Sequence, residues 1–194
     1  MIEYIKGKIT ELNPAYLIIE SAGIGYFVSI SLNTYTQVGS AGNEITLPVH
    51  EVIREDARQL FGFAGRAERE LFRLLISVNG VGPNTARMML SSLHPAEIEK
   101  AISDSNVHLL KSIKGIGQKT AERIIVDLRD KVIKVSAASE IPILRDNTMG
   151  EEALSALMML GFVRSASAKV VDKLMAENPD LTVEELIKQA LRNL

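Results

Sequence analysis

The sequence predicts a multidomain α+β protein with a small β-barrel, a central helical module and a small three-helix bundle. Three observations lead to this prediction. Residues 1–63 form short runs rich in β-branched and aromatic side chains, separated by turn signals. The middle of the chain contains one glycine-centred motif twice, each time between helix-like segments. Residues 148–194 show helical periodicity and two helix-start signals.

Bulk composition excludes several function classes. The 194 residues are 46% hydrophobic, so there is enough apolar surface for two or three buried cores. Cysteine is absent and the three histidines are scattered, so we expect no disulfide, thiol chemistry or metal site. No signal peptide and no apolar run of about 18 residues is apparent. We therefore expect a cytoplasmic protein with no membrane partner.

Positive charge is concentrated in the middle of the chain. Residues 64–134 carry 12 basic and 8 acidic side chains, net +4. Residues 1–63 carry 4 basic and 7 acidic side chains, and residues 135–194 carry 6 and 9, so each flank is net −3. This asymmetry is expected when one module holds phosphates and the others do not.

The first module, residues 1–63, reads as five strands joined by turns. We expect strands over Ile2–Leu12, Tyr16–Ser21, Tyr26–Ser31, Ile45–Arg54 and Arg58–Phe63, with a short helical turn at 32–38. Short strands of this kind predict a small antiparallel barrel. This segment contains five aromatic residues that we consider: Tyr4, Tyr16, Tyr26, Phe27 and Tyr35. Their spacing does not separate core from exposed positions, and we predict core positions for most of them.

The central module, residues 64–134, is organised around the repeated glycine motif. Residues 79–90 read NGVGPNTARMML and residues 114–126 read KGIGQKTAERIIV, 35 residues apart throughout. Each copy follows a helix-like segment, and each begins a new helix directly after Gly-x-Gly. Such a turn points free backbone N–H groups outward at the positive end of a helix dipole, where phosphate binds. The alternative is a pair of tight turns without a ligand, but the shared spacing favours phosphate.

The end of the chain reads as a linker and a bundle. Residues 135–147 lack a clear period and contain a proline, which predicts a flexible linker. Residues 148–194 predict three helices, with capping boxes at Thr148/Glu151 and Thr182/Glu185. The run MMLGF at 158–162 has two interpretations. It fills the small core, or it forms an adaptable surface for a partner.

These motifs together resemble a known family. Gly-x-Gly followed by Thr-Ala is similar to the helix-hairpin-helix motif of DNA-binding proteins. Two copies after a β-rich start, MIEYIKGKI, resemble the RuvA family over the whole chain. The stretches that carry this resemblance most specifically are REDARQLFGF, LFRLLISVNGVGP and IKGIGQKTAERIIVDL. The resemblance implies an OB-fold barrel, a tandem helix-hairpin-helix domain and a UBA-like three-helix bundle.

The resemblance also implies a function and partners. RuvA proteins bind four-way (Holliday) junction DNA as a homotetramer and act with the RuvB motor ATPase in branch migration, recombination and DNA repair. The RuvC resolvase is implied in the same complex. The chain alone is then not an enzyme and needs no cofactor, since RuvB uses the ATP.

The candidate DNA-binding residues lie in and beside the two glycine turns: Asn79, Gly80, Val81, Gly82, Pro83, Asn84, Thr85, Gly115, Ile116, Gly117, Gln118, Lys119, Thr120 and Arg123. The resemblance further implies an acidic pin at Glu55 and Asp56, which by sequence alone is an ordinary charged turn. It places motor binding in the tail, where the candidates are Leu157, Met158, Leu160, Gly161 and Phe162. RuvA proteins often have lysine at the positions of Asn84 and Gln118, so we expect a shallower salt dependence here.

Two other classes stay open. A DNA repair glycosylase or nuclease would bind DNA through the hairpins and would need a catalytic Asp or Lys. Asp127 and Lys119 are the candidates for that residue. A protein-interaction scaffold would use the hairpins only as structure. Base-release and strand-cleavage assays test the first alternative, and a gel-shift on junction DNA tests the second.

Overall fold

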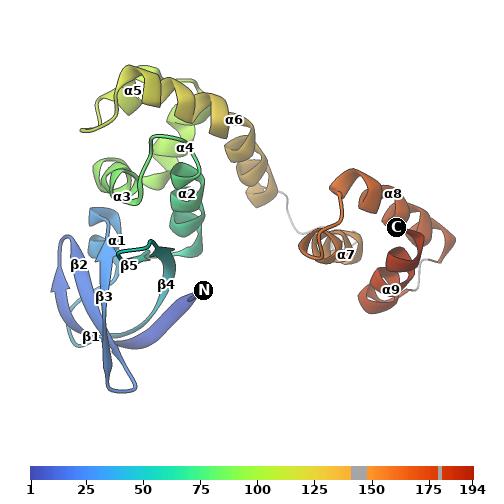
Figure 1. Ribbon diagram of the computed structural model, residues 1–194, viewed down its shortest axis with the longest axis horizontal. Helices are drawn as coiled ribbons and strands as arrows, with labels where there is room; N and C mark the ends of the chain where they lie inside the picture. The colour runs from blue at the N-terminus through green and yellow to red at the C-terminus, as the bar shows by residue number, and fades with distance from the viewer. Residues whose placement is uncertain (141–147, 179–180) are drawn as a thin grey trace. The chain divides into compact units, whose positions relative to one another are not determined.

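The computed structural model describes residues 1–140, 148–178 and 181–194 (Figure 1). Its contacts divide the chain into two compact units, residues 1–139 and residues 140–194. The first unit contains a five-stranded barrel and the helices that follow it, and the second contains three helices. Within the described ranges, no helix has both the length and the apolar character needed to cross a membrane.

The barrel is closed and has one parallel pairing. Its strands are β1 (Tyr4–Asn13), β2 (Tyr16–Ser21), β3 (Ile24–Ile30), β4 (Glu44–Ile53) and β5 (Arg58–Gly62), with helix α1 (Leu32–Gln37) between β3 and β4. They follow the order β1-β2-β3-β5-β4, and β4 pairs with β1. We predicted an antiparallel barrel, which is wrong for β3 and β5. Strand directions cannot alternate all the way round a ring of five, so one pair must be parallel.

Period-two alternation fills the barrel and exposes part of its aromatic content. Inward-facing Leu17 and Val28 are fully buried, whereas Tyr4 and Phe27 are exposed. The Tyr16 ring stacks on the Phe27 ring outside the barrel, with centroids 4.7 Å apart. Only two of the five aromatic residues, Tyr26 and Tyr35, pack against the barrel core. The prediction of core positions for most of them is therefore wrong, because register decides which side of a strand faces inward.

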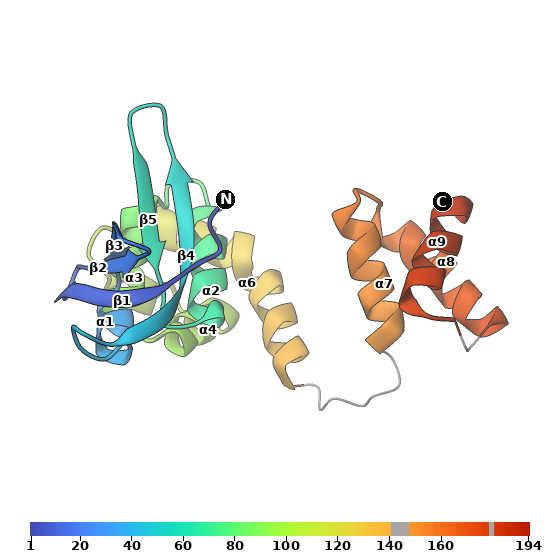
Figure 2. The same cartoon turned by 90° about the horizontal axis from the view of Figure 1, so that it is seen from below.

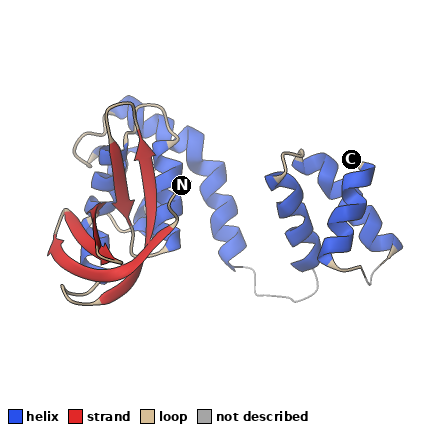
Figure 3. Cartoon of the chain, turned by 60° about the horizontal axis from the view of Figure 1, so that its bottom comes forward, coloured by secondary structure: helices blue, strands red, loops and turns tan. Residues whose placement is uncertain are grey.

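The helices of the first unit are α2 (Arg66–Ile76), α3 (Pro83–Ser92), α4 (Pro95–Ser103), α5 (Val107–Lys111) and α6 (Gln118–Glu140). Figure 3 shows the red strands curving into a barrel and the blue helices of this unit stacked against it. Helix α6 continues through 135–140, which we had assigned to the linker. That part of the prediction is wrong, because alanine-rich 135–140 contains no glycine or proline to end a helix. The rest of the predicted linker, 141–147, lies outside the described residues.

The end of β5 belongs to the apolar core of the helices, while the barrel interior forms a second cluster. The Phe72 ring of α2 lies 5.2 Å from the Phe61 ring and 5.0 Å from the Phe63 ring, measured between centroids. All three side chains are at most 2% exposed, and they belong to the same buried cluster as the cores of α3 to α6. The helical module therefore packs directly against the end of β5, and the two do not move as separate domains joined by a linker.

A buried carboxylate reinforces this junction. Glu68 of α2 is 4% exposed, and its carboxylate accepts hydrogen bonds from Ser31 Oγ at 2.7 Å and Thr34 Oγ1 at 2.8 Å. It also accepts the backbone N–H of Ala64 at 3.0 Å. A buried charge is costly unless it is fully hydrogen-bonded, and here three donors from the barrel side meet it.

Charged groups of α2 also reach the first strand. Arg69 Nη1 donates to Glu3 Oε2 at 2.7 Å, and Arg73 Nη2 lies 3.2 Å from Glu3 Oε1. The hydrogen bonds from Arg73 and then Arg69 hold the pKa of Glu3 below its usual value. Burial, followed by the charges of Arg73 and Arg69, lowers the pKa of His50.

The second unit is a small bundle of α7 (Thr148–Met159), α8 (Arg164–Glu177) and α9 (Val183–Asn193). The predicted capping box at the third helix is confirmed, because Thr182 Oγ1 accepts the Glu185 N–H while the Glu185 carboxylate accepts the Thr182 N–H. Its core consists of small and medium apolar side chains: Ala153, Leu157, Val171, Leu174, Leu186 and Ala190.

We predict that Glu68→Ala destabilises the first unit strongly. The substitution removes the shared acceptor of three buried or half-buried donors at the barrel–α2 contact, which should lower the free energy of unfolding by roughly 3 kcal/mol. Denaturant unfolding followed by circular dichroism measures this. The control is Glu44→Ala at an exposed strand end, for which we expect a change within about 0.5 kcal/mol. Equal effects of the two substitutions would contradict the role given to Glu68.

Candidate nucleic-acid interface

The two glycine turns have the same backbone conformation. Gly80 has φ = 94° and Gly115 has φ = 91°, the left-handed region that favours glycine. In both turns a Cβ added at the glycine would meet nothing within 4 Å, so the conformation and not crowding requires glycine. The sequence repeat is thus a repeat in three dimensions.

The hydrogen bonds that begin the following helices match as well. The N–H of Ala86 donates to the carbonyl of Gly82 at 2.9 Å, and the N–H of Ala121 donates to the carbonyl of Gly117 at 2.9 Å. Both alanines are fully buried. A larger side chain there would push the new helix away from the one before it, so the alanines hold each turn tight.

The first turn presents unpaired backbone donors. Gly82 is the N-cap of α3 with φ = −84°, and it has no side chain to bond the helix start. Pro83 lacks an N–H, so the free donors at the start of α3 are the N–H groups of Asn84 and Thr85. N–H groups in the first turn of a helix have no acceptor within that helix. Among the described residues no acceptor is found for either N–H. Two N–H groups therefore point outward at the positive end of α3.

The second glycine turn presents one more backbone N–H than the first, with lysine side chains beside it. After Gly117, the residues Gln118, Lys119 and Thr120 each carry an N–H at the start of α6. The Lys119 side chain is exposed beside them. Gln118 Nε2 donates to the Glu122 carboxylate one helical turn on. Lys114, before the first glycine of this turn, is a second exposed cation.

An arginine joins the two turns. Arg123 Nη1, from the first part of α6, donates to the backbone carbonyl of Asn79 at 3.2 Å. Arg123 as a phosphate ligand stays a prediction, and the structure shows this contact between the repeats. The apolar residues inside the turns, Val81 and Ile116, are 4% and 5% exposed, so their side chains shape the turns from within.

The predicted acidic pin lies at the end of a projecting hairpin. Figure 2 shows β4 and β5 extending well beyond the rest of the barrel and joined by a short turn. Glu55 and Asp56 are exposed in that turn, which closes when the Arg54 N–H donates to the Ala57 carbonyl at 2.8 Å. Two adjacent carboxylates at this position carry negative charge that repels phosphates.

The tail places its candidate residues on two sides of α7. Leu157 is fully buried in the bundle core and unavailable to a partner, whereas Met158 is 42% and Leu160 61% exposed. Gly161, with φ = 97°, ends the helix, and the Phe162 N–H then donates back to the Leu157 carbonyl at 3.1 Å. This turn leaves the apolar end of α7 uncovered by the rest of the bundle.

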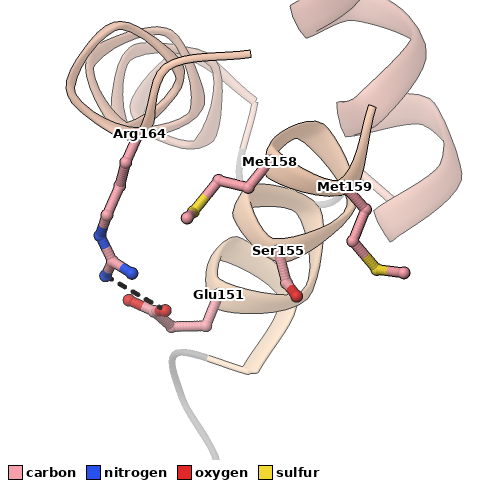
Figure 4. A pocket seen from close by; sticks show the side chains of 5 residues that line it. All are labelled: Glu151, Ser155, Met158, Met159 and Arg164. Carbon is pink, nitrogen blue, oxygen red and sulfur yellow. Dashed lines mark ion pairs between the residues drawn. The ribbon is translucent and has the colours of Figure 1, made fainter. Parts of the chain in front are cut away.

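Two more exposed apolar residues belong to this surface. Met159, which lies within the predicted run 158–162, is 87% exposed, and Val163, which we did not predict, is 68% exposed. Figure 4 shows Met158 and Met159 beside a hollow whose edge carries an ion pair, Arg164 Nη2 to Glu151 Oε2 at 3.7 Å. Met159 lies two positions from buried Leu157, so the helical period places it on another face of α7.

The enzyme alternative finds little support in this geometry. Asp127 and Lys119 both lie on α6 and are exposed. Eight residues of helix separate them, a rise of about 12 Å. Each candidate catalytic side chain therefore lies on an exposed helix surface, as expected for a solvated residue, and the two do not share one site.

Three family models match the chain in succession. The RuvA N terminal domain covers residues 1–62, a SAM-like helix-hairpin-helix tandem covers 72–130, and the RuvA C-terminal domain covers 148–194. Full-length relatives are also similar to it. Proteins named Holliday junction branch migration complex subunit RuvA from Christiangramia forsetii and Parabacteroides distasonis are 50% and 53% identical over 194 and 199 residues, covering 100% of both chains.

Proposed function

This chain belongs to the RuvA family, and we propose that it binds four-way junction DNA and, with a RuvB motor ATPase, drives branch migration in recombination and DNA repair. The observation that carries this proposal is the combination of a full-length family match with two glycine turns of the same conformation. The same match favours this function over a helix-hairpin-helix repair enzyme.

The glycine turns are proposed to hold phosphates of one duplex arm. Each turn offers backbone N–H groups at a helix start, and the Arg123–Asn79 hydrogen bond links the two turns. Contacts of this kind bind the sugar-phosphate backbone and position DNA without reading its bases. Recognition then depends on where phosphates lie in space, which distinguishes a junction from other DNA by shape.

The acidic pin is proposed to act at the centre of the junction. In a tetramer with four-fold symmetry, each subunit would hold one arm and the four pins would meet where the strands cross. Glu55 and Asp56 would repel phosphates there and keep the strands apart. This prevents the centre from binding DNA so tightly that the junction cannot move.

The tail is proposed to dock the motor. Its exposed apolar residues Met158, Met159, Leu160 and Phe162 offer a flexible surface of the kind that adapts to a partner. ATP hydrolysis would belong to RuvB, so this chain needs no cofactor of its own. We place RuvC in the same complex and the assembly in the cytoplasm.

The phosphate site predicts different effects on junction binding for two substitutions of one glycine. Gly82 has a negative φ and open space around it, so a side chain fits. In Gly82→Asp the carboxylate caps the very N–H groups that would bind phosphate and adds negative charge, so junction binding should be lost while the fold stays intact. Gly82→Ala offers no such acceptor and should bind within a fewfold of wild type.

The equivalent pair at Gly117 should behave in the same way. A gel-shift with a four-way junction measures binding, and thermal unfolding checks the fold. A folded Gly82→Asp or Gly117→Asp variant that binds normally would show that the turn concerned holds no phosphate.

Removal of the tail should separate DNA binding from motor coupling. Protein truncated after Asn147 should bind junctions with near-normal affinity, because the tail carries net negative charge. It should fail to support branch migration by RuvB. The full-length variant Leu160→Glu should show the same defect without loss of any helix. Full branch migration by both proteins would refute the docking role of the tail.

Charge reversal of the pin should alter selectivity. Glu55→Lys/Asp56→Lys should tighten DNA binding, by about 1 kcal/mol per charge at low salt, because repulsion at the centre becomes attraction. The preference for junction over linear duplex should fall. Competition gel-shifts across a salt series measure both. If the junction-to-duplex ratio is unchanged at every salt concentration, the pin is an ordinary solvated turn.

A further inference from the structure

The β4–β5 hairpin carries a cross-strand ion pair below its acidic tip. Arg58 Nε donates to Glu51 Oε1 at 3.1 Å, and Arg58 Nη2 donates to the same oxygen at 2.5 Å. The two partners differ sharply in exposure, since the Glu51 side chain is 6% exposed and the Arg58 side chain 70%. The carboxylate is thus held inside while the guanidinium lies in solvent.

Strand register explains why this pair forms. Glu51 is opposite Leu60 and Arg58 is opposite Ile53, so the pair crosses the hairpin diagonally. Ile53 is 65% exposed, whereas Val52 beside it still packs against the helical core, so the hairpin loses its apolar cover from Ile53 toward the tip. A two-stranded hairpin without a core is only marginally stable, so the ion pair gives the pin some of its stiffness.

The same contact orients Arg58 toward solvent. A guanidinium has five N–H donors in a planar fork, and Glu51 engages the edge formed by Nε and Nη2. In the part of the chain that the structure describes, no hydrogen bond is found from Nη1. A guanidinium with one edge fixed and another free loses little entropy when it binds an anion, and its fork matches phosphate oxygens.

We propose that Arg58 binds a phosphodiester of a DNA strand that passes along the side of the pin. The proposal rests on the proposed function, in which the pin meets DNA. Glu55 and Asp56 repel phosphate from the tip, while Arg58, just below them on β5, attracts it. Arg58 then guides a DNA strand along the side of the pin, while the carboxylates at the tip keep that strand out of the junction centre.

Arg54 is the competing cation on this hairpin. It is also exposed, but it lies in the turn itself beside the two carboxylates, and the structure shows only its backbone in a hydrogen bond. Arg58 has the fixed orientation that Arg54 lacks, and it stands on a strand and not on the turn. The ion pair with Glu51 therefore selects Arg58.

The test measures junction affinity over a salt series, by fluorescence anisotropy with full-length protein. Arg58→Gln should weaken binding about fivefold at low salt, the scale of one partly exposed charge contact. The slope of log K against log salt should become shallower by about 0.9 for every Arg58 that meets a phosphate. Arg58→Lys should keep the wild-type slope, because it keeps the charge.

Two further variants separate phosphate binding from stiffening. Glu51→Gln loosens the pin but leaves the Arg58 charge in place, so its slope should not become shallower. Arg192→Gln removes one exposed charge from the second unit and should match wild type. If Arg58→Gln and Glu51→Gln weaken binding equally with unchanged slopes, Arg58 only stiffens the hairpin and the inference is overturned. Wild-type protein without preference for junctions would instead overturn the proposed function, and the inference with it.

Discussion

The packing of Phe72 against Phe61 and Phe63 is the contact on which the candidate DNA-binding surface depends. Phe61 belongs to β5, which descends directly from the acidic tip, and Phe72 belongs to α2, which leads to the first glycine turn. Gly62 lets this end of β5 pack closely against the barrel core, because an added Cβ would come within 2.7 Å of the Leu47 side chain and 2.8 Å of the Val28 side chain. One buried cluster therefore fixes the pin and the turns relative to each other.

This rigidity suits recognition by shape. Contacts to phosphates carry no base information, so selectivity for a junction must come from the fixed spacing of the groups that attract or repel phosphates. Under the proposed function, much of that attraction would come from backbone N–H groups, since Asn84 and the paired Gln118 add no charge to the turns. Backbone donors at a helix start are positioned by the fold itself and need no side-chain ordering on binding.

The features readable from sequence were the local ones. Gly80 and Gly115 could be assigned to turns because a positive φ favours glycine, and Thr182 with Glu185 marked a helix start by spacing alone. The features that were missed depend on distant pairing. The parallel β3–β5 contact follows from closing a ring of five strands, and the exposure of Phe27 follows from register. The Glu51–Arg58 pair likewise depends on how β4 and β5 align, which no short stretch reveals.

Hydrogen–deuterium exchange can show whether backbone N–H groups of both glycine turns bind DNA phosphates, as we propose. In the free protein the N–H groups at 84–85 and 118–120 have no partner in the helices they begin, so they should exchange quickly. Addition of a four-way junction should slow exchange in peptides that cover both turns, and a Gly82→Asp/Gly117→Asp protein should lose this protection. Unchanged exchange at both turns while the junction is demonstrably bound would contradict the account.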